Sequence, residues 1–551
     1  MKDFVDDKIG TVTAISLPGE FQFQINSEKR PIVHDFVVVK HPFDEKIPIL
    51  AKILKISRFN PLLPDEAAFE LAKLQIEEHF TPLPLSGKLE MLVGFCKVLG
   101  YLDEFGNLKN PGFPIKPGSE VFTPNKKFMD KVMGVRDNSL MVGFLRNKES
   151  VEISVVGNEI LNKHIAILAM TGAGKTYAAS VILEELIKKG YPLLILDPHG
   201  DYVNLNEKED KKEHFIYQLE KNKGTYSLKV CNNTFDPKEL SESELIEYIS
   251  NASGEDITDA QLGLYQKMMK ILTDKKNREE FLSEDLSEQC LEDDDMDDLV
   301  KKLDINKHGF SAIFKYLELK TKYFKKGQGE GKGSFYAMYR QINKASQLLK
   351  GIDTSLTVEE VEKNLGLGKG VVLNMSALPY AVQRISAYII VKSLFEKRKK
   401  YISSNKSDKD QKICPLFVVV EEAHNFAPAS TEGEDYPSLA ILRRIATEGR
   451  KFGVGLCIIS QRPSRVDQTV LSQCNSQMIL RVVNPTDQNY IGSIIESLAS
   501  EDLQALQDLS PGEALISGLM TKLPAVIRVR KRESKEGIKA VNRFQEILEY
   551  K

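Results

Sequence analysis

The chain has 551 residues, so at roughly 150 residues per domain it should divide into three or four domains. Apolar residues make up 42% and charged residues 28% of the sequence, which excludes a disordered or fibrous protein. Seventy-five Lys and Arg balance 78 Asp and Glu to a net charge of −3, so no overall positive field would draw the protein to nucleic acid.

The apolar runs of the sequence are short. Runs such as 164–170 and 416–420 lie far below the roughly 18 residues that a membrane span needs. Acidic residues within 3–7 occupy the place where a secretory signal has its apolar stretch. We therefore expect a cytoplasmic protein without a membrane partner. Six scattered cysteines form no Cys-x-x-Cys pair, so we expect reduced thiols and neither disulfides nor a zinc site.

The first predicted elements are short strands. Polar and apolar residues alternate in stretches broken by Pro and Gly, which predicts a small antiparallel barrel with strands near 10–15, 21–25, 35–39 and 49–56. Residues 65–80 are helix-like, and strands resume between 88 and 156. We place the first boundary near residue 155, which gives an amino-terminal β-barrel domain over 1–155.

The pattern then changes to strand, Gly-rich turn, helix and strand, with these elements near 164–168, 175–189 and 193–196. This alternation predicts an α/β fold around a parallel sheet. A charged and mainly helical insertion interrupts the alternation, which resumes at 371–375. The expected parts after the barrel are an α/β core over 156–204 and 366–530, an inserted helical subdomain over 205–365 and a tail over 531–551 that braces a neighbouring subunit.

The insertion holds two local biases. In 279–298, eleven of twenty residues are Asp or Glu, and we interpret this stretch as a solvated helix and loop. Residues 324–333 are rich in Lys and Gly. They fit either a basic loop that touches phosphates or a plain surface linker, and the linker is the favoured interpretation.

A P-loop motif lies between the first strand and helix of the α/β core. Small residues there let backbone amides approach phosphates closely, and the following helix adds its N-terminal dipole. Lys175 would reach the β and γ phosphates of ATP, and the Thr176 hydroxyl would bind Mg2+. The motif departs from its pattern at the first position, where Ala169 replaces Gly. The expected nucleotide-binding residues are Thr171, Gly172, Ala173, Gly174, Lys175, Thr176 and Tyr177.

An acidic strand end complements the P-loop. The apolar run 416–420 is followed by Glu421 and Glu422, and the turn after a strand can aim both carboxylates at a nucleotide. We assign Glu421 to the magnesium shell and Glu422 to the attacking water. A second acid, Asp197, ends a neighbouring predicted strand, where parallel strands bring their carboxyl ends to one edge. His199 follows it and fits either a proton shuttle or a structural role.

Two further polar residues complete the predicted catalytic set. Gln461 ends the apolar strand 453–460 and can hydrogen-bond the γ phosphate or the water. Arginines and a lysine lie just before that strand, and one of them would reach the next subunit's nucleotide as an arginine finger. We favour Arg450, with a solvated helix face as the alternative. The candidates for this role are Arg443, Arg444, Arg450 and Lys451.

Five motifs carry a resemblance to a known family: Thr171–Thr176, Asp197–Gly200, Glu421–Pro428, Glu448–Gly453 and Ser460–Pro463. On these motifs the chain resembles HerA, the hexameric DNA translocase and helicase of the FtsK/HerA branch of P-loop ATPases. The resemblance covers about 160–530, and the amino-terminal strands resemble the small HAS-type barrel of that family. The pair Asp-Pro-His-Gly and Glu-Glu-Ala-His-Asn-Phe is far more specific than a P-loop alone.

The resemblance implies a RecA-like ATPase core in a homohexameric ring that hydrolyses ATP with Mg2+ and moves double-stranded DNA through its channel. It further implies a partner, either a NurA-like nuclease in DNA end processing or another effector in anti-phage defence. It supports Lys175, Asp197 and Glu422 as catalytic and matches Arg450 to the arginine of the family's motif. A ring would also gather Lys and Arg around a pore, so duplex binding should depend on assembly.

Two other functions stay open at this point. One is a ring ATPase that drives secretion or conjugation, although such motors usually carry membrane helices. The other is a ring scaffold that assembles and activates an effector enzyme. The basic cluster 397–400 is a weak pore candidate, and complementing the C-terminal dipole of its own helix is the favoured interpretation.

Overall fold

The computed structural model describes residues 2–26, 28–59, 91–135, 138–146, 148–207, 226–234, 242–253, 255, 257–285, 296–323, 332–350, 352–404, 413–429, 437–495, 498 and 500–537. Contacts within the chain divide it into two compact units. The first unit comprises 1–185, 461–463 and 475–532, and the second comprises 186–460, 464–474 and 533–551. We describe each unit by itself.

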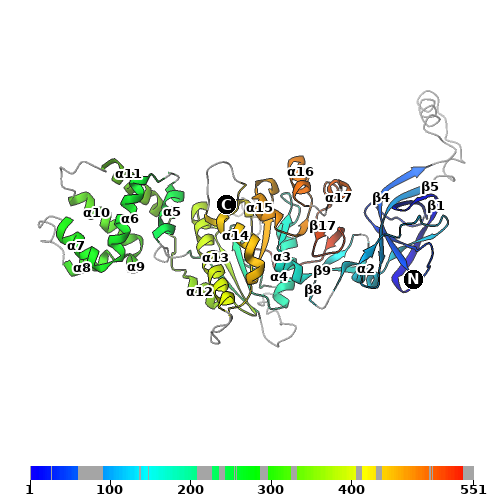
Figure 1. Ribbon diagram of the computed structural model, residues 1–551, viewed down its shortest axis with the longest axis horizontal. Helices are drawn as coiled ribbons and strands as arrows, with labels where there is room; N and C mark the ends of the chain where they lie inside the picture. Colours follow the sequence, from blue (N-terminus) through cyan, green and yellow to red (C-terminus); the bar gives the residue numbers. More distant parts are fainter. Residues whose placement is uncertain are drawn as a thin grey trace, which may run out of the picture. The chain divides into compact units, whose positions relative to one another are not determined.

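The first unit begins with a closed antiparallel barrel, drawn in blue in Figure 1. The strand order is β2-β1-β7-β3-β4-β5, and β5 also pairs with β2, which closes the ring. The short strand β6 extends β5. The expected amino-terminal barrel is therefore confirmed. Its strands are β1 (Val5–Leu17), β2 (Glu20–Ile25), β3 (Phe36–Lys40), β4 (Pro48–Phe59), β5 (Met91–Leu102), β6 (Leu108–Lys109) and β7 (Glu120–Pro124).

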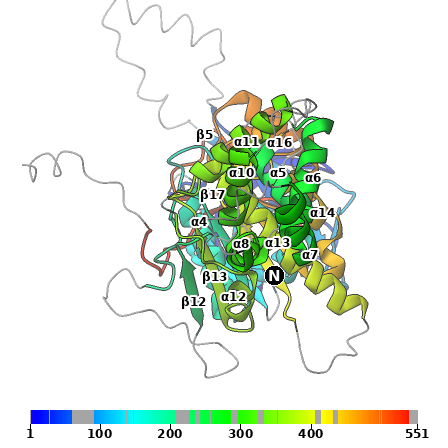
Figure 2. The ribbon, with the colours of Figure 1, turned by 90° about the vertical axis from the view of Figure 1, so that its left-hand side faces the viewer.

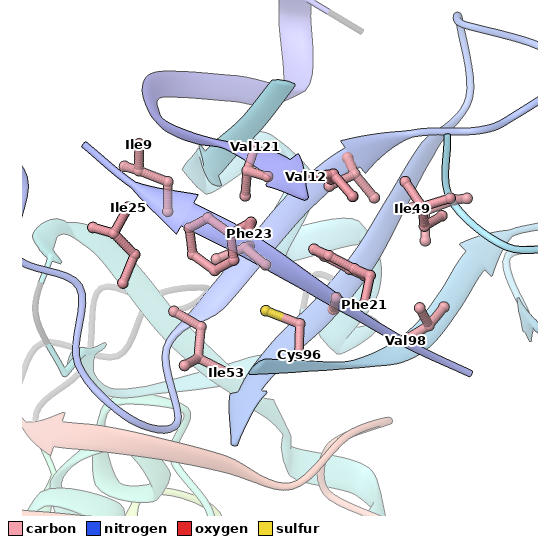
Figure 3. Close-up of a cluster of buried hydrophobic side chains, with 14 residues drawn as sticks. Ile9, Val12, Phe21, Phe23, Ile25, Ile49, Ile53, Cys96, Val98 and Val121 are labelled. Carbon is pink, nitrogen blue, oxygen red and sulfur yellow. The ribbon is translucent and has the colours of Figure 1, made fainter. Parts of the chain in front are cut away.

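The barrel interior is filled by alternate side chains of these strands, as Figure 3 shows. In β2, Phe21, Phe23 and Ile25 are buried while the residues between them are more exposed, which is the period of two that the sequence predicts. The ring of Phe23 requires glycine beside it. A Cβ on Gly94 would lie 2.4 Å from this ring, and a Cβ on Gly10 would lie 2.7 Å from it.

The first unit continues into a mixed sheet of order β10-β16-β17-β18-β8-β9. Strands β10 and β16 are parallel, and the remaining pairs are antiparallel. The boundary near residue 155 stays a prediction. Within the first unit, β8 pairs with β18 and β9 pairs with β8. The strands are β8 (Ser139–Leu145), β9 (Lys148–Val156), β10 (Ile165–Leu168), β16 (Ser476–Ile479), β17 (Glu513–Gly518) and β18 (Ala525–Val529).

The helices of the first unit precede and follow these strands in the sequence. Helix α2 (Lys126–Met133) follows the barrel, and it begins at Asn125, whose side chain accepts a hydrogen bond from the Phe128 amide at 3.0 Å. Helix α3 (Gly157–Lys163) precedes β10, and α4 (Lys175–Lys188) follows it. Helices α16 (Pro485–Ile494) and α17 (Ser500–Ala505) follow β16.

The second unit contains a parallel sheet of order β12-β13-β11-β14-β15. Every residue of β11, β14 and β15 is buried, as is usual for parallel strands covered on both faces. Together with β10 and α4 of the first unit, these elements confirm the predicted α/β class. The strands are β11 (Leu193–Asp197), β12 (Ser227–Cys231), β13 (Lys369–Asn374), β14 (Leu416–Val420) and β15 (Val454–Ser460).

Helices follow several of these strands in the second unit. Helix α13 (Tyr380–Ser403) follows β13, and α14 (Pro437–Phe452) packs against it. Helix α12 (Val358–Lys363) also contacts α13, and α15 (Gln468–Ser472) follows β15.

The inserted segment is mainly helical, as expected, and its described helices are green in Figure 1. In Figure 2, α5, α6, α10 and α11 lie side by side, and their mutual contacts agree with this view. The segment 205–365 is not helical throughout, because β12 joins the edge of the parallel sheet. The helices are α5 (Glu242–Ser253), α6 (Asp259–Thr273), α7 (Lys275–Glu280), α8 (Met296–Lys302), α9 (Ile305–His308), α10 (Phe310–Tyr323) and α11 (Lys332–Gln347), with a π turn η3 (Phe281–Asp285).

Several expectations fall wholly or partly outside the described residues. These are the helix near 65–80, half of the acidic stretch 279–298, most of the loop 324–333 and the tail beyond residue 537. The described part of the tail contacts its own chain. The Lys535 amide donates to the Glu207 carbonyl at 2.7 Å, and Asn204 Nδ2 donates to the Glu536 carbonyl at 3.0 Å.

The sequence analysis expected reduced thiols and no membrane-spanning segment, and the described residues bear on both expectations. The five cysteines there are free, and four of them are buried. Among the same residues, no helix combines the length and apolar character that crossing a membrane requires.

Candidate active site

The loop that follows β10 has the backbone of a phosphate-binding loop. Gly172 and Gly174 have φ angles of +79° and +94°, which glycine adopts without strain. Ala169, at the first motif position, is fully buried. Among the described residues, the non-glycine positions with positive φ are His34, His164 and Glu422. Ala169 therefore keeps an ordinary φ, and its replacement of Gly leaves the loop geometry intact.

Helix α4 begins directly at the end of this loop. Lys175 is its first residue and is 5% exposed, and the Ala178 amide donates to the Gly174 carbonyl at 2.9 Å. The first-turn amides and the helix dipole therefore point toward the loop, which is the arrangement that binds phosphate. Tyr177 faces the tail: its hydroxyl accepts a hydrogen bond from the Arg532 amide at 2.8 Å, and the guanidinium lies 6.0 Å from its ring centroid.

Gln461 contacts the P-loop directly. The Thr171 hydroxyl donates to Gln461 Oε1 at 2.6 Å, and the Thr171 side chain is exposed. The sequence predicted Gln461 as a residue near the γ phosphate. The structure brings its amide to the loop that would hold that phosphate.

In the second unit, the carboxyl end of β14 holds two buried acids. Glu421 is fully buried and accepts a hydrogen bond from the Tyr202 hydroxyl at 2.6 Å. Burial and the nearby Glu421 charge raise the pKa of Tyr202 well above its usual value, so this phenol stays protonated as a donor. Glu422 is 4% exposed and has φ +47° and ψ +52°. This left-handed backbone is how the turn redirects the second carboxylate after the strand ends.

Two residues that the sequence analysis did not select accompany Glu422. His424 Nδ1 lies 3.3 Å from Glu422 Oε2 and 3.3 Å from the Ser460 hydroxyl. His424 stands on the 3-10 turn η5 (Ala423–Asn425), and Ser460 is the last residue of β15. The side chains of Glu422, His424 and Ser460 thus form one polar cluster at the carboxyl ends of β14 and β15.

Asp197, at the end of β11, holds the turn that follows it. Its Oδ1 accepts hydrogen bonds from the His199, Gly200 and Asp201 amides at 3.3, 2.8 and 3.0 Å, and Oδ2 accepts from the Tyr202 amide at 2.9 Å. Burial is the main influence on this carboxyl and raises its pKa. This geometry favours a positioning role, in place of the catalytic role expected from the sequence. The His199 residue lies on the same turn and is exposed.

The four candidates for the arginine finger, which lie before β15, differ in their ion-pair partners. Arg443 pairs with Asp467 at 2.7 Å, and Arg444 pairs with Glu396. Arg450 and Lys451 are exposed at the end of α14. Among the described residues, no ion pair to Arg450 is present. Arg450 is therefore the arginine of this group that can reach another molecule without first breaking an ion pair.

The basic cluster 397–400 is tied to its own chain. Lys397 pairs with Glu362 at 2.7 Å, and Arg398 Nε donates to the Phe452 carbonyl at 2.7 Å. The cluster lines a cavity of about 750 Å3 beside the starts of β11 and β14. This is the amino end of the strands, opposite the end that carries the acids. These contacts favour the structural interpretation over a pore lining.

A metal site made from protein groups alone is not found in the described residues, where no group of three or more His, Cys, Asp or Glu side chains is arranged to hold a metal ion. The oxygen ligands that remain are the Thr176 hydroxyl and the Glu421 and Glu422 carboxylates. Mg2+ commonly binds one or two carboxylates and completes its shell with water and substrate phosphates. The Thr176 hydroxyl in the first unit and the two carboxylates in the second are therefore oxygen groups of the chemical type that Mg2+ binds.

The parallel strands, the glycine-bearing loop at the start of α4 and the acidic end of β14 define an α/β protein of the P-loop class. Comparison with known families is consistent with this class. Residues 140–394 match the family model described as the central domain of helicase HerA, and the match begins inside β8. Over this central part the chain is similar to the HerA helicase family.

Relatives resemble the chain over most of its length. The DNA double-strand break repair helicase HerA of Pyrococcus furiosus is 28% identical, with 95% of this chain and 92% of the relative covered. The protein of the same name from Sulfolobus acidocaldarius is 27% identical, with 91% and 89% covered. Among solved structures, VirB4 of Thermoanaerobacter pseudethanolicus is 16% identical and covers 72% of this chain and 97% of its own, with a TM-score of 0.46.

Proposed function

We propose that this protein hydrolyses Mg2+-ATP and uses the free energy to move double-stranded DNA through a ring of six copies. The observation that carries the proposal is the P-loop of this chain, with Gly172 and Gly174 in left-handed conformations and Lys175 at the start of α4. The match to the model of the HerA helicase central domain and the names of the relatives, which are DNA double-strand break repair helicases, support DNA as the polymer.

Each candidate residue has a role in this proposal. The P-loop amides and Lys175 hold the phosphates of ATP, and the Thr176 hydroxyl and Glu421 hold the magnesium ion that arrives with them. The bound ion supplies charge neutralisation on the phosphates. Glu422 orients the attacking water and accepts its proton, and Gln461 contacts the γ phosphate or the water. Arg450 reaches the nucleotide of the adjacent subunit. Tyr177 lies in the first turn of the same helix, next to the residues that bind the nucleotide, and its hydroxyl accepts a hydrogen bond from the Arg532 amide.

The chain would act with a partner protein. The relatives' names point to double-strand break repair. In that setting the proposed partner is a nuclease that processes DNA ends. An anti-phage role with another effector uses the same motor chemistry. The two settings are distinguished by identifying which protein co-purifies with the chain and whether that protein cleaves DNA.

The first prediction tests the hydrolytic site. Lys175→Ala removes the cation that holds the phosphates, and Glu422→Gln keeps the shape of the side chain but removes the base. Both changes should reduce DNA-stimulated ATP hydrolysis by about 100-fold or more, which is the size that a positioned general base contributes. Glu422→Gln should retain ATP binding, and Lys175→Ala should weaken it. Phosphate release and binding of a fluorescent ATP analogue measure the two effects.

The matched control is Lys116→Ala, which removes an exposed cation outside the P-loop and outside the group of finger candidates. It should leave hydrolysis within about twofold of the unaltered protein, since exposed charges far from a site contribute little. Normal turnover in Lys175→Ala would contradict the assignment of the nucleotide site. Hydrolysis that does not respond to duplex DNA in the unaltered protein would contradict the DNA motor.

A further inference from the structure

An aromatic ring lies directly beside the phosphate-binding loop. Tyr177 follows Thr176 in the sequence and lies in the first turn of α4, where it is half-buried. Its hydroxyl accepts a hydrogen bond from the Arg532 amide at 2.8 Å. The ring is therefore held at its polar end, while part of the residue stays open to a ligand.

The Arg532 guanidinium lies over the same ring. Its central carbon is 6.0 Å from the ring centroid, and Arg532 is 4% exposed. A cation is attracted to the face of an aromatic ring, and the attraction is stronger where water is excluded. Because a ring has two faces, a guanidinium over one face leaves the other face for a second planar group. Tyr177 and Arg532 therefore form a stacking pair with one side already occupied.

The backbone that carries Arg532 is tied to α4 by a buried ion triad. Arg530 forms ion pairs with Glu184 at 2.9 Å and with Glu185 at 3.0 Å, and all three side chains are 10% exposed or less. These residues, like Tyr177, belong to the first unit. The segment after β18 is thus joined to the second half of α4 by Arg530 and to its first turn by Arg532. These two attachments fix the position of the ring.

The loop itself offers no flat side chain to the base of a nucleotide. Residues 169–176 contain no aromatic, amide or guanidinium side chain, and their backbone amides and Lys175 serve the phosphates. Gln461 contacts the loop at Thr171, on the side that we assign to the γ phosphate. The ribose separates the base from the phosphates, so the base lies outside the loop. Tyr177 is the first aromatic side chain that follows the loop in the sequence.

We propose that Tyr177 binds the purine base of the nucleotide by stacking, and that Arg532 is a positioning residue that holds the ring for it. A purine has a larger flat surface than a pyrimidine, so stacking favours ATP over CTP. This inference rests on the proposed ATPase function and names the residues that select its nucleotide. Other groups hold the phosphates, so binding of the base and binding of the phosphates are separable.

The test compares binding of a complete nucleotide with binding of its phosphate chain alone. Titration calorimetry with Mg2+ gives Kd for a non-hydrolysable ATP analogue and for inorganic tripolyphosphate. Tyr177→Ala should raise Kd for the ATP analogue by roughly 5- to 150-fold, the usual size of one base–aromatic contact, and should leave Kd for tripolyphosphate within about twofold. Tyr177→Phe keeps the ring, and its Kd for the ATP analogue should stay within about fivefold of the unaltered protein.

Arg532 is tested through the ring that it holds. Arg532→Ala keeps the amide that bonds to Tyr177 but removes the guanidinium, and it should raise Kd for the ATP analogue by roughly two- to fivefold. Arg532→Lys retains a cation and should recover part of this loss. In a Tyr177→Ala background, Arg532→Ala should add less than about 1.5-fold, because the ring it holds is gone. A full repeat of the loss in that background would overturn the positioning role.

Two results of the Tyr177→Ala titrations would overturn the stacking role. One is an equal loss of affinity for tripolyphosphate and for the ATP analogue, which would show damage to the loop. The other is an unchanged Kd for both ligands. A CTP analogue gives a further measurement, because the preference for the ATP analogue over it should shrink in Tyr177→Ala. An undiminished preference would assign base selection to another residue and contradict the inference.

Controls separate this inference from the proposed function. Tyr336→Ala removes a tyrosine of α11 that is 57% exposed, and it should leave both Kd values unchanged. Circular dichroism checks that each variant is folded at the temperature of the titration. If the unaltered protein binds neither ligand, the proposed nucleotide site fails. If it binds both and Lys175→Ala weakens both, the site stands, and the Tyr177 variants decide this inference alone.

Discussion

Non-glycine residues with positive φ angles mark places where the backbone is held against its local preference, and two of them lie beside titratable groups of interest. Glu422 and His34 have φ angles of +47° and +75°. Such a conformation costs a non-glycine residue roughly 1–2 kcal/mol, so the surroundings must hold it. At Glu422 the bonds of the following turn do so, and the result is a carboxylate beside His424. At His34 the backbone amide donates to the Ile53 carbonyl at 2.8 Å.

The His34 ring predicts a pH-dependent stability. Burial, and after it the Lys52 charge, lowers the pKa of His34 from 6.5 to about 4, with Arg146 adding to this and Asp502 and Asp508 opposing it. The folded state therefore resists protonation, whereas the unfolded state accepts a proton near pH 6.5. The stability that His34 contributes is complete above pH 6.5 and is lost as the pH falls from 6.5 towards 4.

The measurement is the urea midpoint of the unfolding transition between pH 7.5 and 5. The slope due to His34 should stay below about 1.4 kcal/mol per pH unit, because the ring is partly exposed. His34→Asn removes the titrating group and suits a left-handed backbone, so it should flatten the dependence over this range. A variant with the slope of the unaltered protein would assign the pH dependence to other groups.

The sequence alone predicted most residues of the candidate site but not how they are held. Lys175, Glu422 and Gln461 follow from strand ends and motif spacing, because the carboxyl ends of parallel strands share an edge. His424 and Ser460 lie 36 positions apart, and their meeting depends on the pairing of β14 with β15, which no local pattern encodes. The catalytic role of Asp197 stays a prediction, because its hydrogen bonds to the following turn also fit a positioning role. An acid at a strand end looks the same in sequence whether it faces a ligand or caps its own turn.

Among the elements, β4 of the barrel and α17 are joined by a buried ion pair. Lys52 Nζ lies 2.5 Å from Asp502 Oδ1, and each side chain is 8% exposed. Removing charges from water is costly, so the pair depends on both partners being present. This contact ties a barrel strand to a helix 450 positions later in the chain.

Breaking this pair should destabilise the first unit. Asp502→Ala leaves the Lys52 ammonium buried without its carboxylate and should cost roughly 3–5 kcal/mol of unfolding free energy. Lys52→Met combined with Asp502→Leu replaces both charges with apolar groups and should recover most of that loss. Urea unfolding of the three proteins measures the difference.

The exposed pair between Lys8 and Glu120 provides the control. Its atoms lie 2.8 Å apart, but the side chains are 48% and 43% exposed. Glu120→Ala should therefore cost no more than about 1 kcal/mol. A loss in Asp502→Ala as small as that in Glu120→Ala would mean that water reaches the buried pair and that it does not hold α17 to the barrel.

Element boundaries were harder to predict than element types. The alternating strands of the barrel follow from the period of their apolar residues, and the apolar strands of the core follow from the length of their apolar runs. Strands β8 and β9 follow the barrel in the chain and alternate in the same way, so the sequence does not separate them from it. Strand β8 pairs with β18, which lies more than 350 positions further on, and β9 pairs with β8. Strand β12 was missed because an edge strand of five residues with exposed positions has little apolar pattern.

For the whole molecule, a net charge of −3 fits a motor that binds DNA only after assembly, since a ring gathers the basic side chains of six copies around one channel. In the proposed function, the role of the exposed Arg450 depends directly on assembly of the ring. Its partner would be a nucleotide on the next subunit. Its removal should therefore affect hydrolysis in rings without affecting nucleotide binding by the subunit that carries the change.

The test of this assignment uses rings that contain two inactive variants. Arg450→Ala keeps the P-loop, and Lys175→Ala keeps the arginine. If Arg450 acts on the adjacent subunit, then in co-expressed rings about a quarter of the interfaces join an intact loop to an intact arginine. Such rings should hydrolyse ATP well above the sum of the two separate variants. If Arg450 acts within its own subunit, every subunit is defective and mixing restores nothing.

Lys451→Ala in place of Arg450→Ala should be active before mixing, since it leaves both the loop and the arginine in every subunit. Absence of rescue with an active Lys451→Ala control would place the finger on another residue.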